Sequence, residues 1–338
     1  MLLQSGKASP SSVKRRDFQS RRVHFIAQNV PLLLALLILV CTLLLYAILF
    51  YINQRRFPAN FEITSIVNNS LPLALAAVGQ TMVVLTGGID LSVGGMIDLA
   101  NSLAAINMQN NPSSVVEWSV LILLVGAAGG LLNGLFVVVG RLQPILVTLA
   151  TLSIFQGLAI RVLPAPGGAV PPAFTTALTN PAAPTGLVPL ALLIALWLLF
   201  RRTPLGVGIF TIGNDEQAAR ANGVPVLTTK LGAYVLGGIL AALAGLFLAA
   251  TSTSGDATSG NVFTLTSIAA TVLGGVSLAG GRGSAMGSIA GAFVLTTLIN
   301  VLFFAHVDPL YQSFYQGLFL ILAVVISSLV GLYFRRRK

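Results

Sequence analysis

Long apolar runs separated by short polar or glycine-rich segments fill the chain from residue 30 to residue 334. Most of these runs approach the ~20 residues with which a helix crosses the hydrocarbon core of a bilayer. The pattern therefore predicts an all-α, polytopic helical membrane protein with roughly ten transmembrane helices. The predicted spans are 30–52, 67–86, 93–109, 117–139, 143–163, 186–200, 231–251, 264–280, 285–305 and 313–334.

Composition supports this fold class and limits the domain organisation. Of the 338 residues, 55% are hydrophobic and only 8% are charged, whereas soluble domains carry roughly 25% charged residues. We expect a basic cytoplasmic tail at residues 1–28 and one transmembrane domain at residues 29–338, with a cytoplasmic loop at about 201–230. No soluble catalytic domain fits into this plan.

The net charge of +10 is concentrated at the two ends of the chain. Because cytoplasmic segments of membrane proteins are enriched in Lys and Arg, both termini are predicted to lie inside. This distribution points to anionic lipid, and not nucleic acid, as the contact of the tails. The positive residues before the first run and after the last include Lys14, Arg15, Arg16, Arg21, Arg22 and Arg335–Lys338.

Two glycine pairs, Gly87–Gly88 and Gly94–Gly95, frame the carboxylate of Asp90 directly after an apolar run. A carboxylate at membrane depth is costly and by default marks a functional site. Glycine-rich backbone at that depth is tolerated where it is buried in protein or lines a water-filled path, which predicts a broken helix. Capping of the next helix start by Asp90 is the competing interpretation, and both stay open.

A weak internal repeat accompanies this segment. Val84–Leu91 resembles Val272–Leu278 with one residue deleted, so the chain is predicted to have two weakly similar halves. Paired glycine breaks at corresponding positions indicate a central transport site. Close helix packing through small residues is the alternative explanation.

Neutral polar side chains recur within the spans. They suit a hydroxylated solute better than an ion, although interhelical hydrogen bonding explains any single one of them. With the glycine breaks and the carboxylates, they give the candidate residues for a substrate path or gate. These are Gln80, Thr86, Gly87, Gly88, Asp90, Ser92, Asp98, Asn101, Thr151, Gln156, Gly274, Gly275, Ser277 and Asn300.

The stretch Gly213–Gly223 is too polar to enter the membrane. Asn214 or Asp215 can cap a short helix that Gly223 closes, and such a helix either docks onto another protein or is an ordinary loop helix.

The chain has no phosphate-binding loop, because Gly280–Ser284 lacks the lysine and the full spacing. We expect no bound cofactor, no metal site and no catalytic residues, since His24 and His306 are isolated and Cys41 is the only cysteine.

The proline-rich connection at 164–185 is predicted to lie outside. It contains too many prolines for a continuous helix. A rigid rim that touches an external partner and a simple linker are equally compatible with its sequence.

Taken together, these motifs resemble the permease subunits of bacterial ABC importers for monosaccharides, of the ribose, xylose and galactose type. The resemblance covers most of residues 65–325 and departs from the family at Gln156 and Gln316, where many members carry a basic residue. The segments that carry it are Ala76–Gly95, Thr148–Ser153, Gly213–Gly223 and Leu273–Ser284.

This resemblance implies a multi-pass protein of the bacterial inner membrane that works with other chains. The implied partners are a second permease subunit, identical or paralogous, a cytoplasmic ATP-binding cassette ATPase that uses the ATP, and an extracytoplasmic sugar-binding protein. The 213–223 loop then becomes the coupling helix to the ATPase. Its implied coupling residues are Asn214, Asp215, Glu216, Ala219, Arg220 and Gly223.

Two other function classes remain as alternatives. A proton-coupled secondary transporter would use Asp90 or Asp98 as its coupling carboxylate, and it would transport without an ATPase. A non-transporting membrane scaffold would use the polar intramembrane residues for structure alone. The sequence does not select among pentoses, hexoses and sugar alcohols as the transported solute.

Overall fold

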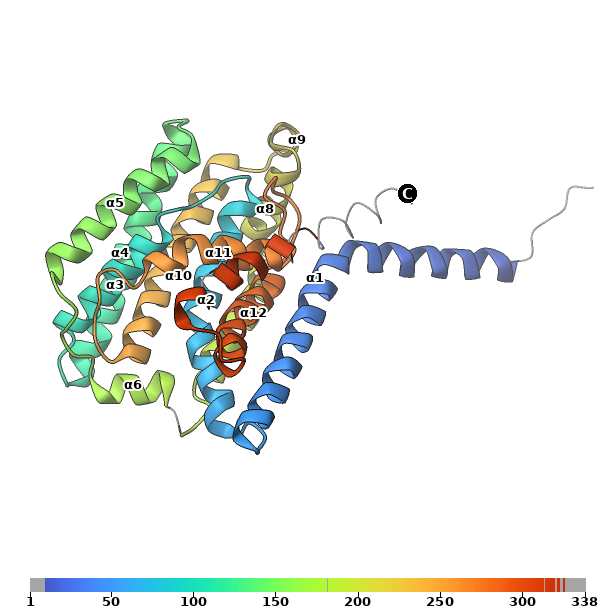
Figure 1. The fold of residues 1–338 in the computed structure, drawn as a ribbon. Helices are drawn as coiled ribbons and strands as arrows, with labels where there is room; N and C mark the ends of the chain where they lie inside the picture. Colours follow the sequence, from blue (N-terminus) through green and yellow to red (C-terminus); the bar gives the residue numbers. More distant parts are fainter. Residues whose placement is uncertain (1–9, 181, 313, 320, 323–324, 326–338) are drawn as a thin grey trace, which may run out of the picture.

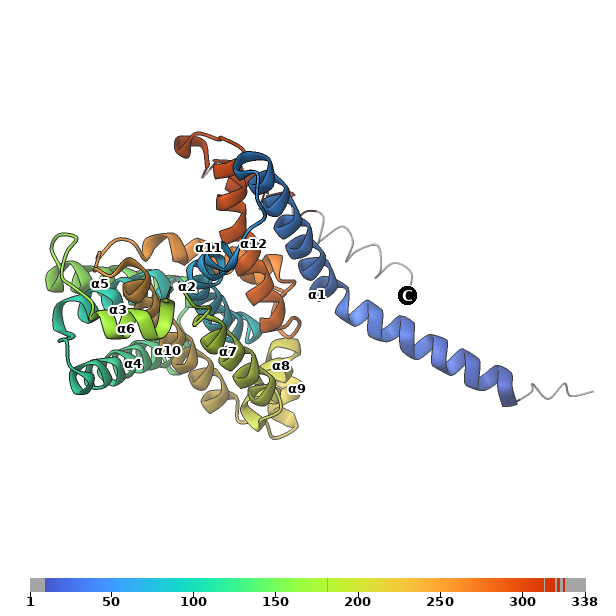
Figure 2. The same cartoon turned by 90° about the horizontal axis from the view of Figure 1, so that it is seen from below.

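The structure is a computed structural model that describes residues 10–180, 182–312, 314–319, 321–322 and 325. The described residues are helical and contain no strand beyond one isolated bridge between Gly167 and Gly255 (Figures 1 and 2). The elements are α1 (Pro10–Gln54), α2 (Asn60–Leu85), α3 (Val93–Asn107), α4 (Pro112–Gly134), a π-helical turn η1 (Leu135–Val139), α5 (Pro144–Val162), α6 (Pro172–Thr179), α7 (Leu187–Phe200), α8 (Pro204–Asn214), α9 (Glu216–Ala221), α10 (Val226–Ser252), α11 (Asn261–Leu273) and α12 (Ala285–Phe304).

The predicted fold class is confirmed. Six described helices are long and apolar enough to cross a membrane, and the bent pair α7–α8 brings the number to seven if it counts as one span. α3 and α11 are shorter than these six helices. The count of ten spans and the cytoplasmic position of both termini stay predictions. Most of the predicted last span, 313–334, lies outside the described residues.

α2 and α10 form the centre of the bundle. α10 packs against α2, α3 and α4, and nearly all of α2 from Ile66 to Leu85 is buried. In contrast, α1 exposes much of its apolar surface, including Leu33, Leu37 and Leu44. Figure 1 shows α1 along one side of the bundle, with its first turns projecting away from it.

Glycines bring α4 and α10 into backbone contact. A Cβ at Gly130 would lie 2.2 Å from the Tyr234 carbonyl oxygen, and one at Gly238 would lie 2.1 Å from the Gly126 carbonyl oxygen. Small residues are how membrane helices achieve such close approach. The glycines of α4 are therefore packing residues that set the separation of the two helices.

α2 and α11 end with the same turn, in line with the predicted repeat. Gly87 and Gly275 follow the helix ends with φ values of +84° and +82°, a conformation that glycine adopts without steric cost. Each turn has the paired hydrogen bonds of a Schellman motif. The amide-to-carbonyl bonds are Gly88 to Val83 and Gly87 to Val84 after α2, and Val276 to Thr271 and Gly275 to Val272 after α11.

The predicted span 264–280 extends too far at its C-terminal end. α11 ends at Leu273 because the Gly274–Gly275 turn stops it, and the chain then forms a tight loop in which Ser277 N donates to Arg282 O. Gly280 and Gly281 both have positive φ in this loop. The interpretation of this glycine-rich stretch as a tight turn is confirmed.

The proline-rich connection packs onto the bundle and contains the short helix α6. The Ala169 amide donates to the Ala105 carbonyl, and Val170 N donates to Thr253 O. The Thr179 hydroxyl donates to the Ala250 carbonyl at 3.2 Å. These contacts hold α6 and the residues just before it against the bundle.

Candidate substrate path and coupling helix

Asp90 lies in the non-helical link between α2 and α3 and is only 2% exposed. Its Oδ1 accepts hydrogen bonds from the Ser92 amide at 2.8 Å and from the Ser92 hydroxyl at 2.6 Å. Ser92 immediately precedes the first residue of α3. The carboxylate therefore holds the residue that precedes α3 in a local side-chain-to-backbone turn, whereas the first turn of α3 itself has no side-chain cap.

Gln80 holds the same link from within α2. With its amide oriented to satisfy both partners, Nε2 donates to the Asp90 carbonyl at 2.9 Å and Oε1 accepts from the Asp90 amide at 3.3 Å. Gln80 is fully buried. A non-helical residue at membrane depth needs partners for its backbone groups, and this single side chain supplies both.

Two further side chains extend these contacts across the bundle. Asn133 of α4 donates from Nδ2 to the Ser92 hydroxyl at 2.8 Å, and Thr151 of α5 donates to Asn133 Oδ1 at 2.7 Å. All of these groups are at most 3% exposed. We call Gln80, Asp90, Ser92, Asn133 and Thr151 the Asp90 network, which connects α2, the α2–α3 link, α4 and α5.

Tyr234 of α10 lies beside this network. A Cβ at Gly88 would be 2.7 Å from the Tyr234 hydroxyl, and this buried hydroxyl has no hydrogen-bond partner among the described residues. Gly88 is thus required for space. Any side chain at this position would displace the link or the tyrosine.

The other predicted path residues have different partners. Asp98 Oδ1 accepts from the Gly260 amide at 2.5 Å, and Asn101 Oδ1 accepts from the Asp256 amide at 2.8 Å. Both side chains therefore hold the loop between α10 and α11, and the Asp98 carboxyl binds the residue that immediately precedes α11. The Thr86 hydroxyl donates to Val83 O at 2.8 Å and belongs to the end of α2.

The remaining candidates are distributed over three elements. Gly274, Gly275 and Ser277 form the turn that follows α11. Gln156 of α5 and Asn300 of α12 are half-buried. Neither of their side chains makes a hydrogen bond to the Asp90 network within the part of the chain that the structure describes.

Two residues of the site were not among the sequence candidates. Asn133 joins α4 to Ser92, and Tyr234 closes the space next to Gly88. Asn133 has a signal in the sequence, because a polar amide interrupts a glycine-rich apolar run. Tyr234 has none, since its role depends on the close packing of α10 against α4.

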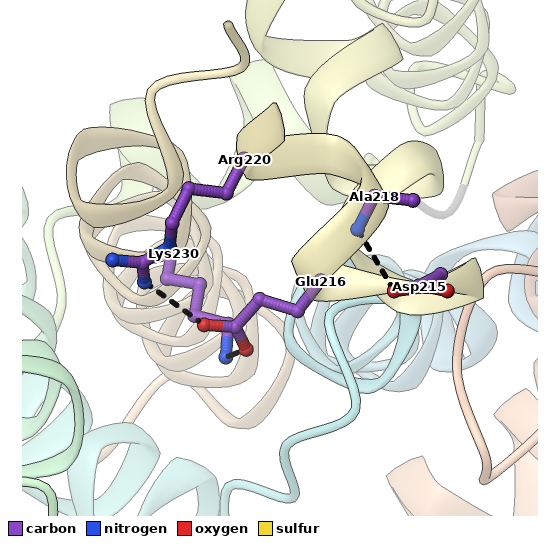
Figure 3. Close-up of polar contacts among 5 residues, drawn as sticks. All are labelled: Asp215, Glu216, Ala218, Arg220 and Lys230. Carbon is purple, nitrogen blue, oxygen red and sulfur yellow. Dashed lines mark hydrogen bonds and ion pairs between the residues drawn. The ribbon is translucent and has the colours of Figure 1, made fainter. Parts of the chain in front are cut away.

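The polar loop forms the short helix α9, which begins at a capping residue (Figure 3). Asp215 Oδ1 accepts from the Ala218 amide at 2.9 Å, as expected for one of the two predicted caps. Asn214 is the last residue of α8. Gly223 follows α9 with a φ of +80°, so it closes the helix in the left-handed conformation.

Glu216 attaches α9 to α10. Its Oε2 accepts from Lys230 Nζ at 2.6 Å, and its Oε1 lies 3.4 Å from Arg220 Nη2 (Figure 3). The hydrogen bond from Lys230 is the main cause that lowers the pKa of the Glu216 carboxyl below its usual range. The carboxylate is therefore charged at neutral pH.

Apolar contacts beneath α9 complete this attachment. Ala219 is 4% exposed and packs with Ile212 of α8 and Val226 of α10. In contrast, Gln217 and Arg220 are exposed. α9 therefore has one anchored face and one free polar face, which fits a helix that binds another protein.

Comparison with known proteins identifies the family. The family described as "Branched-chain amino acid transport system / permease component" matches residues 62–324. The chain belongs to this permease family. It is also 34% identical to the ribose import permease protein RbsC of Bacillus subtilis (strain 168) over 330 residues, which cover 91% of the chain and 96% of that protein.

Other relatives agree with this assignment. RbsC of Escherichia coli (strain K12) is 33% identical, with 86% of this chain and 92% of that protein covered. The autoinducer 2 import system permease protein LsrC of Yersinia pestis (strain Pestoides F) is 33% identical, with 86% and 83% covered. No solved structure matches the chain.

This membership confirms the predicted class. The chain is a multi-pass permease subunit of an ABC importer in the bacterial inner membrane, and it is a transport component and not an enzyme. An importer of this kind implies a separate ATPase chain and a binding protein as partners.

Proposed function

We propose that this permease forms the translocation path for a monosaccharide or a related polyol. The observation that carries the proposal is the Asp90 network, which holds a non-helical link between α2 and α3 at membrane depth. Its side chains are buried and bonded to one another and to backbone, so they position a helix break of the kind that borders a transport site and do not contact the solute themselves. The names of the relatives RbsC and LsrC support import of a small solute of this class.

The predicted path residues take two roles in this proposal. Gln80, Asp90, Ser92 and Thr151 keep the α2–α3 link in a defined position beside the path, and Asp98 and Asn101 do the same for the α10–α11 loop. The glycine turns after α2 and α11 are the points at which the path narrows or opens. Gln156, Ser277 and Asn300, which are half-buried, form its polar lining.

The energy comes from a separate ATP-binding cassette ATPase, and this chain itself holds no cofactor. We assign the exposed face of α9 as the docking site for this ATPase, because α9 is anchored to α8 and α10 on its other face. Asn214 and Asp215 form its start, Glu216 and Arg220 supply its polar contacts, and Ala219 and Gly223 permit close packing. ATP-driven closure of the ATPase then moves α9.

The extracytoplasmic binding protein delivers the sugar to the opposite end of the bundle. The fastened segment at 164–185 suits a docking rim, since it is held by backbone bonds to Ala105 and Thr253. Binding at one end and ATP hydrolysis at the other alternately open the two ends of the path. The cytoplasmic position of both termini, the basic tail at 1–28 and the loop at about 201–230 belong to the same proposal.

Two further contacts lie within the membrane. Lipid covers α1, whose exposed side chains are apolar, and anionic headgroups bind the basic tail.

A second permease subunit, identical or paralogous, packs on the exposed face of α5. On that face, Ala150, Ser153 and Gly157 are small and exposed, and a Cβ at Gly157 would meet no atom within 4 Å, so another helix has room for close approach.

The test is uptake of radiolabelled ribose into proteoliposomes that contain this permease with its ATPase and binding protein. We expect uptake that requires ATP on the ATPase side and persists in the presence of a protonophore. Uptake by the permease alone that the protonophore abolishes would instead establish a proton-coupled transporter. Absence of uptake under both conditions, for ribose, xylose, galactose and sugar alcohols, would reject the proposed substrate class.

A further inference from the structure

The glycine-rich loop after α11 connects the helix that precedes α9 to the end of α2. The Gly281 amide donates to the Leu85 carbonyl at 3.0 Å, and Asn214 Nδ2 donates to the Gly281 carbonyl at 3.2 Å. Leu85 is the last residue of α2, and Asn214 is the last residue of α8. Three segments that are distant in sequence therefore meet at one point.

This junction consists of backbone packed on backbone. A Cβ at Gly213 would lie 1.9 Å from the Leu85 carbonyl oxygen and 2.3 Å from the Gly281 amide nitrogen. A Cβ at Gly281 would lie 2.6 Å from the Asn214 amide nitrogen. Apart from the Asn214 side chain, these contacts join backbone to backbone. Closely packed groups of this kind transmit displacement instead of absorbing it.

On one side, the junction continues into α9 without a linker. Asn214 ends α8, and the next residue, Asp215, caps α9. Ile212, Ala219 and Val226 pack together beneath this corner. α8, α9 and the start of α10 are therefore held together next to the junction.

On the other side, the junction continues into the Asp90 network. Leu85 is followed by the Gly87–Gly88 turn, in which the Gly88 amide is bound to the Val83 carbonyl. Asp90 then has its backbone held by Gln80 and its carboxylate held by Ser92. A shift of the end of α2 thus changes the position of a link that is hydrogen-bonded through to α4 and α5.

We propose that Gly213, Asn214 and Gly281 are positioning residues that transmit the movement of α9 to the α2–α3 link. This inference rests on the proposed function, because it assumes that an ATPase moves α9. The contact among these three residues links the ATPase-driven movement of α9 to the position of the α2–α3 link. α9, the loop 277–283 and the end of α2 move as a single unit during transport.

The first experiment compares Asn214→Ala with Asn107→Ala in the reconstituted importer. Each asparagine donates from Nδ2 to the main-chain carbonyl four residues earlier, Asn214 to Phe210 and Asn107 to Leu103, both at 2.9 Å, but Asn214 also donates to Gly281. We expect Asn214→Ala to keep ATPase association and to lower the sugar transported per ATP hydrolysed severalfold, with Asn107→Ala unchanged. An equal ratio in both variants and the wild type would overturn the proposal.

A second measurement tests the rigid connection without disturbing it. Cys41 is the only cysteine, so Cys41→Ser allows spin labels at Gln217→Cys and Leu278→Cys, both exposed positions. With labelled chains diluted in unlabelled ones, we expect the same interlabel distance in the nucleotide-free and vanadate-trapped complexes. A change of several ångströms would show that the segments move separately. If the wild type shows no ATP-dependent uptake, the proposed function fails, whereas a changing distance in an active importer rejects only this inference.

Discussion

At the scale of single residues, the polar groups inside the membrane act mainly through backbone contacts. Asp90 binds the Ser92 amide, Gln80 binds both backbone groups of Asp90, and Asp98 binds the Gly260 amide. These side chains replace hydrogen bonds that are lost where the helices are interrupted. Each break in a helix therefore occurs together with the side chains that bind its free backbone groups.

Two substitutions of Asp90 separate a structural role from a proton-coupling role. Asp90→Asn keeps an oxygen that accepts from Ser92, so we expect a folded protein with most of its ATP-driven uptake. Asp90→Ala removes the acceptor for two buried donors, at a cost of about 1–3 kcal/mol, and should lower both the melting temperature and uptake. Loss of all uptake in a stable Asp90→Asn protein would favour a proton-carrying carboxylate.

The Glu216–Lys230 ion pair gives a testable dependence on pH. Because the hydrogen bond from Lys230 lowers the pKa of Glu216, this contribution to stability is present above the unfolded-state pKa of about 4.3. It is lost as the pH falls through the lower pKa of the folded state. We expect the melting-temperature difference between wild type and Glu216→Gln to shrink as the pH falls below this unfolded-state pKa.

The control for this titration is Glu117→Gln, at an exposed position of α4. It changes the same chemical group without touching the ion pair, and it should follow the wild type across the range. A Glu216→Gln difference that stays constant over the whole acid range would contradict the stabilising role of the pair.

At the scale of elements, glycines decide where helices end and how closely they pack. Gly87 and Gly275 end α2 and α11 in the same way, and the glycines of α4 allow contact with α10. Both uses explain why glycine recurs in so apolar a chain. Within the internal repeat both interpretations stay open, because Gly275 ends α11 while a Cβ at the neighbouring Gly274 would lie 2.3 Å from the Gly287 carbonyl carbon.

Substitution on α4 tests the packing role. In Gly130→Val, the new side chain would meet the Tyr234 carbonyl, and overpacking of this kind costs about 1–3 kcal/mol or more. We expect a lower melting temperature and a lower yield in detergent. Ala128→Val, at an exposed position of the same helix, is the matched control. Equal stability of the two variants would refute close α4–α10 contact.

The limits of prediction from sequence follow from the same elements. Apolar runs predicted the long helices between residues 30 and 305, because burial in a membrane needs only a long apolar segment. The shorter α6 and α8 were not predicted. The predicted end of the span 264–280 was wrong because the apolar run continues through Gly274–Gly275. There the helix is stopped by backbone conformation and not by a change in hydropathy. Local signals also predicted α9, since Asp215 and Gly223 act on their own neighbours.

The Asp90 network could be predicted only in part. Gln80 and Thr151 were candidates because each is polar within a predicted span, and Asp90 and Ser92 because they lie in the glycine-rich break between two spans. Their hydrogen bonds, the contribution of Asn133 and the proximity of Tyr234 depend on how α4, α5 and α10 pack. Likewise, nothing in the sequence places Gly281 beside Leu85.

At the scale of the whole molecule, the polar Asp90 network is connected to the loop helix α9, which is anchored to the bundle on one face. The network lies at the link that follows α2, and α9 follows α8 directly. The loop after α11 is hydrogen-bonded to the last residues of α2 and α8. A permease needs such a connection, because the movement driven by ATP hydrolysis in a separate chain must be transmitted to the solute path through contacts within the permease. We propose that the ATPase acts on the permease at α9.

The most direct measurement is ATP hydrolysis by the reconstituted importer, with and without ribose-loaded binding protein. It compares the wild type with a variant in which residues 215–222 are replaced by a glycine–serine linker. We predict stimulation of hydrolysis in the wild type and none in the variant, although circular dichroism and gel filtration show the variant to be folded. Undiminished stimulation in the folded variant would contradict the assignment of α9 as the coupling helix.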